Sequence, residues 1–246
     1  MPVELQSIAV VPEKPQVLVT ALVRHLSELA EFAYRKRQIV AYSGRTGIGK
    51  TVAVRWLAYH LAMPKLVLRC RAITVKSQIV SALALGPEAS RRLVRRHTSA
   101  EMFDMAIDRY RDGPPLVIFD EADRLKETCF ELLRDFWDEI RLPMLLVGNE
   151  GLEPKIDRQL ERLARRIRRY RERDLRQPEL RQVLGYMAYE MSDQEFQLIW
   201  KHCGGSPGWA EAVLGLAEYI AERHNAKRGI EDIAGALELV PARPGK

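Results

Sequence analysis

The segment GRTGIGKT, residues 44–51, limits the possible folds of this chain more than any other part of its sequence. It fits the pattern GxxxxGK[ST] in full, and it lies between the apolar run QIVAYS and the segment VAVRWLAYHLA, whose apolar residues recur at helical spacing. A glycine-rich turn between a strand and a helix lets backbone N–H groups surround a phosphate, while the lysine contacts the β- and γ-phosphates and the threonine hydroxyl contacts Mg²⁺. The alternative is a chance glycine-rich turn, which the flanking strand and helix patterns disfavour. We therefore predict a phosphate-binding loop that consists of Gly44, Arg45, Thr46, Gly47, Ile48, Gly49, Lys50 and Thr51.

Alternating strand and helix patterns surround this loop. Short apolar runs predict strands at residues 38–44, 65–70, 116–120 and 142–149, and helical periodicity predicts helices at 18–37, 52–62, 77–85, 100–112 and 127–140. Beyond residue 177 only helical patterns occur, at 178–191, 193–203, 209–225 and 230–240. The predicted fold is an α/β P-loop NTPase with a parallel sheet flanked by helices and a small all-helical C-terminal lid. The predicted domains are residues 1–176, of which 1–15 are extended, and residues 177–246.

Two acidic residues end the predicted strand LVIFDEAD, residues 116–123. In a P-loop protein the first acid, Asp120, is expected to hold Mg²⁺ together with Thr51, and Glu121 is expected to orient or deprotonate the attacking water. The structural alternative is that these acids only cap the next helix. Asn149 ends the next predicted strand in LLVGN, where its amide can position the water; alone it would be an ordinary turn residue.

Composition restricts the possible partners and the cellular location. The formal net charge is +6 and the isoelectric point is near 9.3, which favours an anionic partner and nucleic acid first. Cys70, Cys129 and Cys203 are widely spaced and indicate reduced thiols rather than a zinc site or a disulfide framework. Neither a secretory signal nor a membrane-length apolar stretch is recognisable, so the expected location is cytoplasmic, with no membrane partner.

The series GRTGIGKT, LVIFDEADRL, LLVGN and RLARRI, followed by helices, resembles the AAA+ ATPases. The stretch from DEADRL to LLVGN is similar to the DNA-transposition ATPases, such as the phage Mu B protein, TnsC and TniB. The resemblance implies ATP and Mg²⁺ as cofactors, and a ring or filament of identical subunits on duplex DNA that marks a target and activates a transposase. It also implies that Lys50 and Thr51 contact phosphate and Mg²⁺, and that Asn149 senses the γ-phosphate.

The family places an arginine finger in a short Arg-rich helix just after the sensor strand. Arg166, in ARRI, matches that position best, and Arg162, one helical turn earlier, is the second candidate. The remaining arginines of RLARRIRRYRER, residues 162–173, are expected to serve subunit packing, DNA or only solvent.

Two features depart from the family pattern. The residues before Gly44 are too few for the helix-turn-helix domain that begins the Mu B protein, so DNA contacts are expected from the ATPase body. The lid segment GGSPGWAEAV resembles the second-sensor region but carries Gly208, Trp209 and Glu211 where an arginine is usual. The residues at this position therefore do not predict that the lid senses the γ-phosphate.

Duplex DNA is expected to be bound through its backbone, without sequence preference. The predicted contacts are in the loop after the second strand and consist of Arg71, Thr74, Lys76 and Ser77. A second basic run contains Arg91, Arg92, Arg95 and Arg96, for which an ordinary solvated surface is an equally good interpretation.

Three other functions share parts of this pattern. A helicase loader or replication initiator would carry the same ATPase motifs and differ only in its partner. A nucleotide-switched adaptor would bind ATP and scarcely hydrolyse it, which the predicted catalytic role of Glu121 disfavours. A metabolic P-loop kinase has no support, because no second substrate site is recognisable in the sequence.

Overall fold

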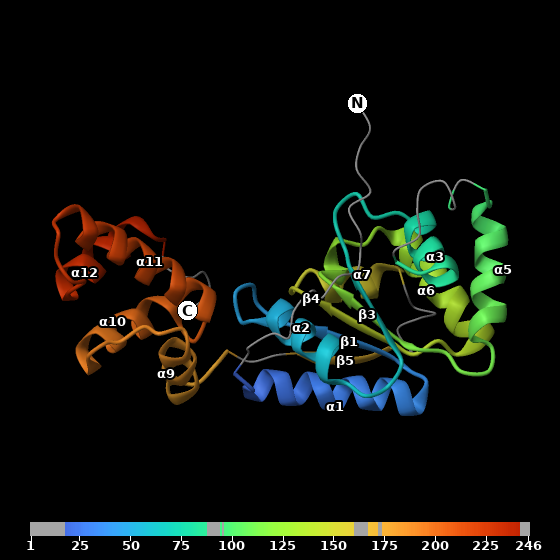
Figure 1. Ribbon diagram of the computed structural model, residues 1–246, viewed down its shortest axis with the longest axis horizontal. Coiled ribbons are helices and arrows are strands. Elements are labelled where there is room, and N and C mark those ends of the chain that lie inside the picture. Colours follow the sequence, from blue (N-terminus) through green and yellow to red (C-terminus); the bar gives the residue numbers. More distant parts are fainter. Residues whose placement is uncertain (1–17, 88–93, 95, 160–166, 172–173, 242–246) are drawn as a thin grey trace. The chain divides into compact units, whose positions relative to one another are not determined.

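A computed structural model describes residues 18–87, 94, 96–159, 167–171 and 174–241. The chain divides into two compact units, of which the first comprises Met1–Gly44 with Lys50–Glu172 and the second Arg45–Gly49 with Arg173–Lys246. The first unit is an α/β layer structure and the second is helical (Figure 1). In the described part of the chain, no helix is long and apolar enough to cross a bilayer.

A five-stranded parallel sheet forms the centre of the first unit, which confirms the predicted fold class. The strand order is β2-β3-β4-β1-β5, so the phosphate-loop strand lies next to the strand that precedes Asn149. The central strands are buried along their whole length because helices cover both faces of the sheet. The strands are β1 (Ile39–Ser43), β2 (Lys65–Arg69), β3 (Leu116–Asp120), β4 (Met144–Gly148) and β5 (Ile167–Arg171).

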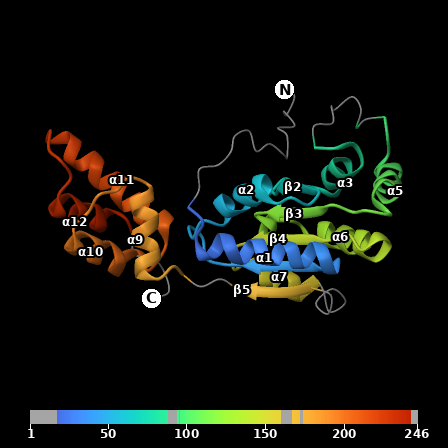
Figure 2. The same cartoon turned by 60° about the horizontal axis from the view of Figure 1, so that its bottom comes forward.

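Helices pack on both faces of this sheet (Figures 1 and 2). One face is covered by α1 (Ala21–Lys36) and α2 (Lys50–His60). The opposite face is covered by α3 (Lys76–Leu85), α5 (Ser99–Tyr110), α6 (Glu127–Ile140) and α7 (Leu152–Gln159). The order strand, loop, helix, strand thus brings the carboxyl ends of β1, β3 and β4 to one edge of the sheet, where a P-loop protein binds its ligand.

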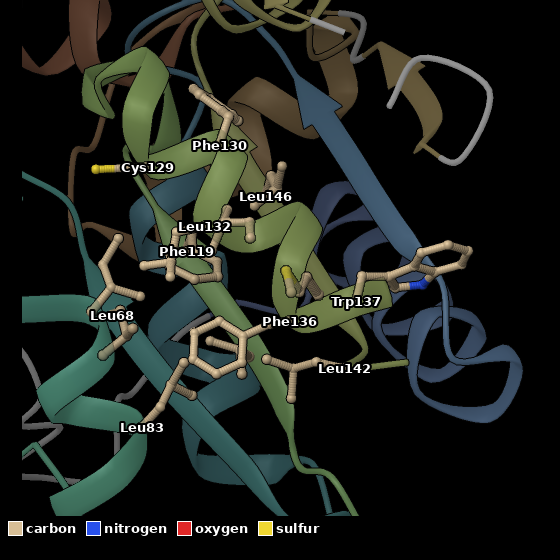
Figure 3. Close-up of a cluster of buried hydrophobic side chains, with 14 of the residues drawn as sticks. Leu68, Leu83, Phe119, Cys129, Phe130, Leu132, Phe136, Trp137, Leu142 and Leu146 are labelled. Carbon is tan, nitrogen blue, oxygen red and sulfur yellow. The ribbon is translucent and has the colours of Figure 1, made fainter. Parts of the chain in front are cut away.

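The apolar stripe of α6 fills the core beneath this edge (Figure 3). Phe136 is fully buried, and its ring lies 4.5 Å from that of Phe103 on α5. The indole N–H of Trp137 donates to the carbonyl of Arg37 over 2.9 Å, which satisfies the polar end of a largely buried side chain. This packing supports the end of β3 and the turn that follows it, where Asp120 and Glu121 lie.

The second unit contains four described helices around their own apolar core. Ser192 caps one of them by accepting from the backbone N–H of Glu195. The first helix ends at Tyr186 rather than at the predicted residue 191, and Ala188 just beyond it has a left-handed φ of 64°. The helices are α9 (Gln177–Tyr186), α10 (Asp193–Cys203), α11 (Pro207–Arg223) and α12 (Ile230–Leu239).

A fifth strand, not predicted from the sequence, lies within the Arg-rich stretch. Ile167–Arg171 forms β5, an edge strand paired with β1. Long charged side chains suit an edge strand, because they remain in solvent and discourage pairing with other chains. Arg169 pairs with Asp157 at 2.5 Å and Arg171 with Glu150 at 3.3 Å, so these two arginines bind acids of this same unit.

Candidate active site at the carboxyl edge of the sheet

The phosphate-loop sequence forms the connection between β1 and α2. Gly47 and Gly49 have φ values of 83° and 96°, a backbone region that favours glycine. The Lys50 ammonium donates to the carbonyl of Gly44 over 2.7 Å, so the side chain crosses the loop that precedes it. Because α2 begins at Lys50, the N–H groups of its first turn are directed to the loop and favour an anion there.

Thr51 and Asp120 meet beside this loop. The Thr51 hydroxyl donates to Asp120 Oδ1 over 3.3 Å, although the two residues are 69 positions apart in the chain. Asp120 is only 4% exposed, and its burial raises the pKa of its carboxyl above the ordinary value, against the lowering effect of the Thr51 hydrogen bond. A hydroxyl and a carboxylate are hard oxygen ligands, so the pair fits Mg²⁺ that also binds phosphate oxygens and water.

Glu121 follows with an unusual backbone and two charged partners. Its φ is 55°, in the left-handed region that non-glycine residues seldom adopt. Its Oε1 accepts from Arg69 Nη2 at 2.7 Å and its Oε2 lies 2.6 Å from Arg124 Nε. Both carboxylate oxygens are thus engaged by guanidinium groups, while the side chain keeps 19% of its exposure. In this arrangement Glu121 lies beside Asp120 with its carboxylate turned to the two arginines.

Asn149 lies at the end of β4. It contacts the turn that follows β3, residues 121–124, which we call the acidic turn. Its backbone N–H donates to Asp123 Oδ1 over 2.9 Å, and its side-chain oxygen accepts from the N–H of Gly151 over 2.8 Å. The second bond directs the amide oxygen into the following loop, so the amide nitrogen is the donor that could contact a phosphate or a water. The structure therefore brings Thr51, Asp120 and Glu121 together and places Asn149 beside them.

Within the second unit, the tip of the phosphate loop contacts the segment that resembles a second sensor. The N–H of Gly208 donates to the carbonyl of Gly47 over 2.9 Å, and Arg45 pairs with Asp174 at 3.4 Å. A Cβ on Gly208 would lie 3.1 Å from the Cα of Gly47, so the approach is tight. The contact at this position is made by a glycine backbone, where the family pattern would have an arginine.

The predicted DNA-contacting loop is only partly at the surface. Arg71 is exposed, Ser77 is partly buried, and Lys76 pairs with Glu131 at 3.3 Å. Thr74 is 5% exposed and its hydroxyl accepts from the N–H of Arg71, so its side chain braces the loop from inside, and its contact with DNA stays a prediction.

Several predicted residues fall outside the described part of the chain. They are Arg162 and Arg166, proposed as the arginine finger, and Arg91, Arg92 and Arg95 of the second basic run; Arg96 of that run is exposed.

Residues 33–156 match the model of a protein family described as "AAA domain". This range includes the phosphate loop, the acidic pair and Asn149, and it covers half of the sequence. The chain belongs to the AAA domain family.

One curated relative of this AAA domain protein is DNA transposition protein B of the Mu-like prophage FluMu of Haemophilus influenzae. The two are 30% identical over 138 residues, which cover 56% of this chain and 47% of that protein. The chain therefore spans about half the length of this relative. The match confirms the predicted resemblance to the transposition branch of the AAA+ ATPases.

Solved structures of the same fold include two DNA complexes and a motor. The ORC1 protein of Aeropyrum pernix in complex with DNA has a TM-score of 0.62 at 20% identity, over 92% of this chain and 66% of that one. The RuvB Holliday junction branch migration motor of Thermotoga maritima has a TM-score of 0.59 at 19% identity, over 92% and 72%. Drosophila ORC bound to DNA has a TM-score of 0.62 at 16% identity, over 89% and 60%. At these identities the likeness establishes the AAA fold alone.

Three further residues belong to the site and were not predicted from the sequence, namely Arg69, Arg124 and Asp123. Arg124 could have been found from its spacing, since a residue three positions after Glu121 lies on the same side of a helical turn. Arg69 could not have been found locally, because it lies beside Asp120 only through the register of β2 with β3. Asp123 contacts Asn149 across 26 positions, which also requires the tertiary structure.

Proposed function

We propose that this AAA domain protein hydrolyses ATP, assembles on duplex DNA and regulates a transposase. The observation that carries the hydrolytic part is the meeting of Thr51 and Asp120, at 3.3 Å, beside a complete phosphate loop and next to Glu121. Similarity to a DNA transposition protein B supports the regulatory part. Assembly on DNA is supported by the basic charge of +6 and by the family resemblance.

Each residue has a distinct task in the proposed reaction. The loop N–H groups and Lys50 hold the β- and γ-phosphates, while Thr51 and Asp120 would hold Mg²⁺. Mg²⁺, when bound, supplies charge neutralisation at the β- and γ-phosphate oxygens. Glu121 accepts a proton from the water whose oxygen attacks the γ-phosphorus, and the bond to the β–γ bridging oxygen breaks, which yields ADP and phosphate. Asn149 positions that water or the γ-phosphate.

DNA can stimulate this reaction through the two arginines that bind Glu121. Arg69 and Arg124 are 52% and 53% exposed, and Arg69 lies two residues before Arg71 of the predicted DNA-contacting loop. A DNA phosphate at this surface would compete with Glu121 for the guanidinium groups, because both are anionic oxygen acceptors. Released from them, Glu121 could turn to the attacking water.

Subunit assembly supplies the remaining element of the proposal. Arg166, with Arg162 as the second candidate, would contact the γ-phosphate bound to a neighbouring subunit. Arginines that act in this way contribute on the order of 10³–10⁵ in rate. We expect Arg166→Ala to keep nucleotide binding and to lose most of the DNA-stimulated turnover, whereas full turnover in that variant would refute the assignment.

Phosphate release with and without duplex DNA tests the hydrolytic part. Glu121→Gln keeps the size of the side chain and removes the base, so we expect it to bind ATP normally and to lose at least about 10²-fold in turnover. Glu139→Gln, an exposed glutamate on α6, is the matched control and should behave as the wild type. Wild-type turnover in Glu121→Gln would eliminate the proposed base, and negligible turnover of the wild type would favour the nucleotide-switched adaptor.

Electron microscopy with ATP and duplex DNA tests assembly, for which we expect a ring or filament with DNA at its centre. Monomers both with and without nucleotide would contradict the proposal.

A helicase loader or replication initiator is the second candidate, since ORC1 shares the fold. Co-purification separates the two, because a bound transposase supports the first and a bound replicative helicase the second.

A further inference from the structure

Asp123 joins the acidic turn to the strand that bears the predicted sensor. It lies in the short 3₁₀ turn Ala122–Arg124, two residues after Glu121. Its Oδ1 accepts the backbone N–H of Asn149 at 2.9 Å. The β3–β4 ladder ends at the pair Asp120 and Val147, so Asp123 provides a partner for Asn149 beyond the last strand pair. The Asp123 side chain thus continues the link between the two strands up to the site itself.

Gly148 shows how closely this turn and strand approach each other. A Cβ on Gly148 would lie 2.9 Å from Asp123 Oδ1 and 3.0 Å from the Asp123 backbone nitrogen. Real Cβ atoms do not come this close to other atoms, so only glycine allows the contact as it stands. On its other side Gly148 accepts the N–H of Gly44, the first residue of the phosphate loop, over 3.3 Å. The end of β4 is thus held by the phosphate loop on one side and by Asp123 on the other.

A lysine holds the turn from the next helix. The Lys155 ammonium on α7 donates to the backbone carbonyl of Asp123 and, at 3.1 Å, to that of Leu125. α7 begins at Leu152, shortly after Asn149, and the N–H of Leu152 donates to the Asn149 carbonyl over 3.0 Å. The acidic turn and the start of α7 are therefore tied together in both directions.

We propose that Asp123 is a positioning residue for hydrolysis, which holds Asn149 at a fixed place relative to Glu121 through its hydrogen bond to the Asn149 N–H. This inference rests on the proposed ATPase function and adds a residue to it. If the Asp123 carboxylate were only a solvated surface group, it would require neither the close approach that Gly148 allows nor the bond to the backbone of Asn149. Catalytic geometry is sensitive to small displacements, since a shift of about 1 Å can cost roughly 10²-fold in rate.

The test compares Asp123→Ala, which removes the acceptor, with Asp123→Asn, which keeps an oxygen in its place. We expect Asp123→Ala to lower kcat by about 10- to 100-fold, with Kd for ADP little changed. Asp123→Asn should retain most of kcat. Asp108→Ala removes an exposed carboxylate of α5 that pairs with Arg111, and it serves as the control.

A double-mutant cycle with Asn149→Ala separates positioning from a general loss of stability. If Asp123 acts through Asn149, the double variant should be no slower than the slower single variant, because the second change removes nothing further. Effects that multiply, or an Asp123→Asn variant as slow as Asp123→Ala, would overturn the proposal.

Gly148→Ala provides a second route to the same displacement if Asp123→Ala does not fold. Its new methyl group should push the Asp123 carboxylate away and reproduce the kcat defect, whereas Gly113→Ala, with nothing within 4 Å, should not. Equilibrium binding of ATPγS and ADP makes the test independent of turnover. We expect the preference for ATPγS over ADP to fall equally in Asp123→Ala, Asn149→Ala and the double variant. An unchanged preference would reject the positioning role even if the wild type did not hydrolyse ATP.

Discussion

Glu121 has a strained backbone conformation, and its carboxylate pairs with two arginines. Other non-glycine residues with left-handed φ, such as Arg37 and Arg141, end helices, where this conformation is common. Glu121 instead follows a buried strand, and such a conformation costs of order 1–3 kcal/mol unless the surroundings maintain it. Bonds from Arg69 and Arg124 are among the surroundings that maintain it. The residue is therefore held in a strained position that a change at either arginine can release.

Removing one of these arginines should raise basal hydrolysis. Half-exposed ion pairs are worth roughly 0.2–1 kcal/mol, so Arg69→Ala or Arg124→Ala should increase DNA-independent phosphate release by up to about fivefold. Stimulation by duplex DNA should fall at the same time, because one of the two ion pairs that DNA would displace from Glu121 is already absent. Arg111→Ala, which removes another surface arginine, should change neither rate. Lower basal release in both variants would show that the arginines help catalysis instead of restraining Glu121.

Asp120 should make the protein less stable at neutral pH than its asparagine variant. Burial raises the pKa of Asp120, so its contribution to stability is fully present below the unfolded value of 3.8 and is lost as the pH rises through the folded-state pKa. At pH 7 Asp120→Asn removes a buried charge and should unfold at a higher temperature without nucleotide, while its binding of ATP with Mg²⁺ weakens. The difference in Tm should shrink as the pH falls toward 3.8. Asp108→Asn, an exposed control, should show no such trend, and a lower Tm for Asp120→Asn at pH 7 would contradict the assignment.

At the scale of elements, α11 contains a glycine that no contact explains. Gly215 is exposed in the interior of this 17-residue helix, and a Cβ there would meet nothing within 4 Å. Glycine lowers helix stability relative to alanine by roughly 0.5–1 kcal/mol because its unfolded backbone is freer. Helix propensity alone therefore predicts the effect of changing it.

Gly215→Ala should stabilise the helical unit by about 0.5–1 kcal/mol, measured by urea or thermal unfolding. Gly205→Ala is the contrasting variant. Gly205 has a φ of 82°, and a Cβ there would lie 2.2 Å from the carbonyl oxygen of Leu175, so this change should destabilise the unit. Stabilisation by both changes would show that the backbone at Gly205 is not constrained as the structure indicates.

At the scale of the whole molecule, positive charge dominates the expected interaction with DNA. A net charge of +6 without a recognisable base-reading motif favours backbone contacts, whose affinity falls linearly with the logarithm of salt concentration. Sequence should matter little, because phosphate contacts carry no direct sequence information.

Fluorescence anisotropy with duplexes of unrelated sequence, at a series of salt concentrations, measures this dependence. Arg71→Ala should weaken binding to every duplex alike and should lower the salt slope by about 1, as expected for one lost phosphate contact. Arg111→Ala has the same change in charge but lies outside the predicted DNA loop, and it should leave the slope unchanged. Equal slopes for all three proteins would remove Arg71 from the DNA surface.

The sequence by itself determined the local elements and the motif that is typical of a phosphate-binding loop. Each of these depends on residues that are close in the chain: alternating apolar runs for the central strands, helical periodicity for α1, α6 and α10, and a glycine-rich turn between a strand and a helix. The neighbouring carboxyl ends of β1, β3 and β4 also followed, since parallel strands share one edge of the sheet.

Only the tertiary structure determined which side chains surround the carboxyl ends of these strands. Arg69 reaches Glu121 across 52 positions through the register of β2 with β3, and no local pattern contains that register. Thr74 is an internal brace because its hydroxyl accepts the backbone N–H of Arg71, whereas Arg71, in the same short loop, is exposed. Ile167–Arg171 became a strand because β1 offers an edge to pair with, which outweighs the local preference of an Arg-rich stretch. Local periodicity thus determines elements, whereas pairing and burial across distant segments determine which side chains face the site.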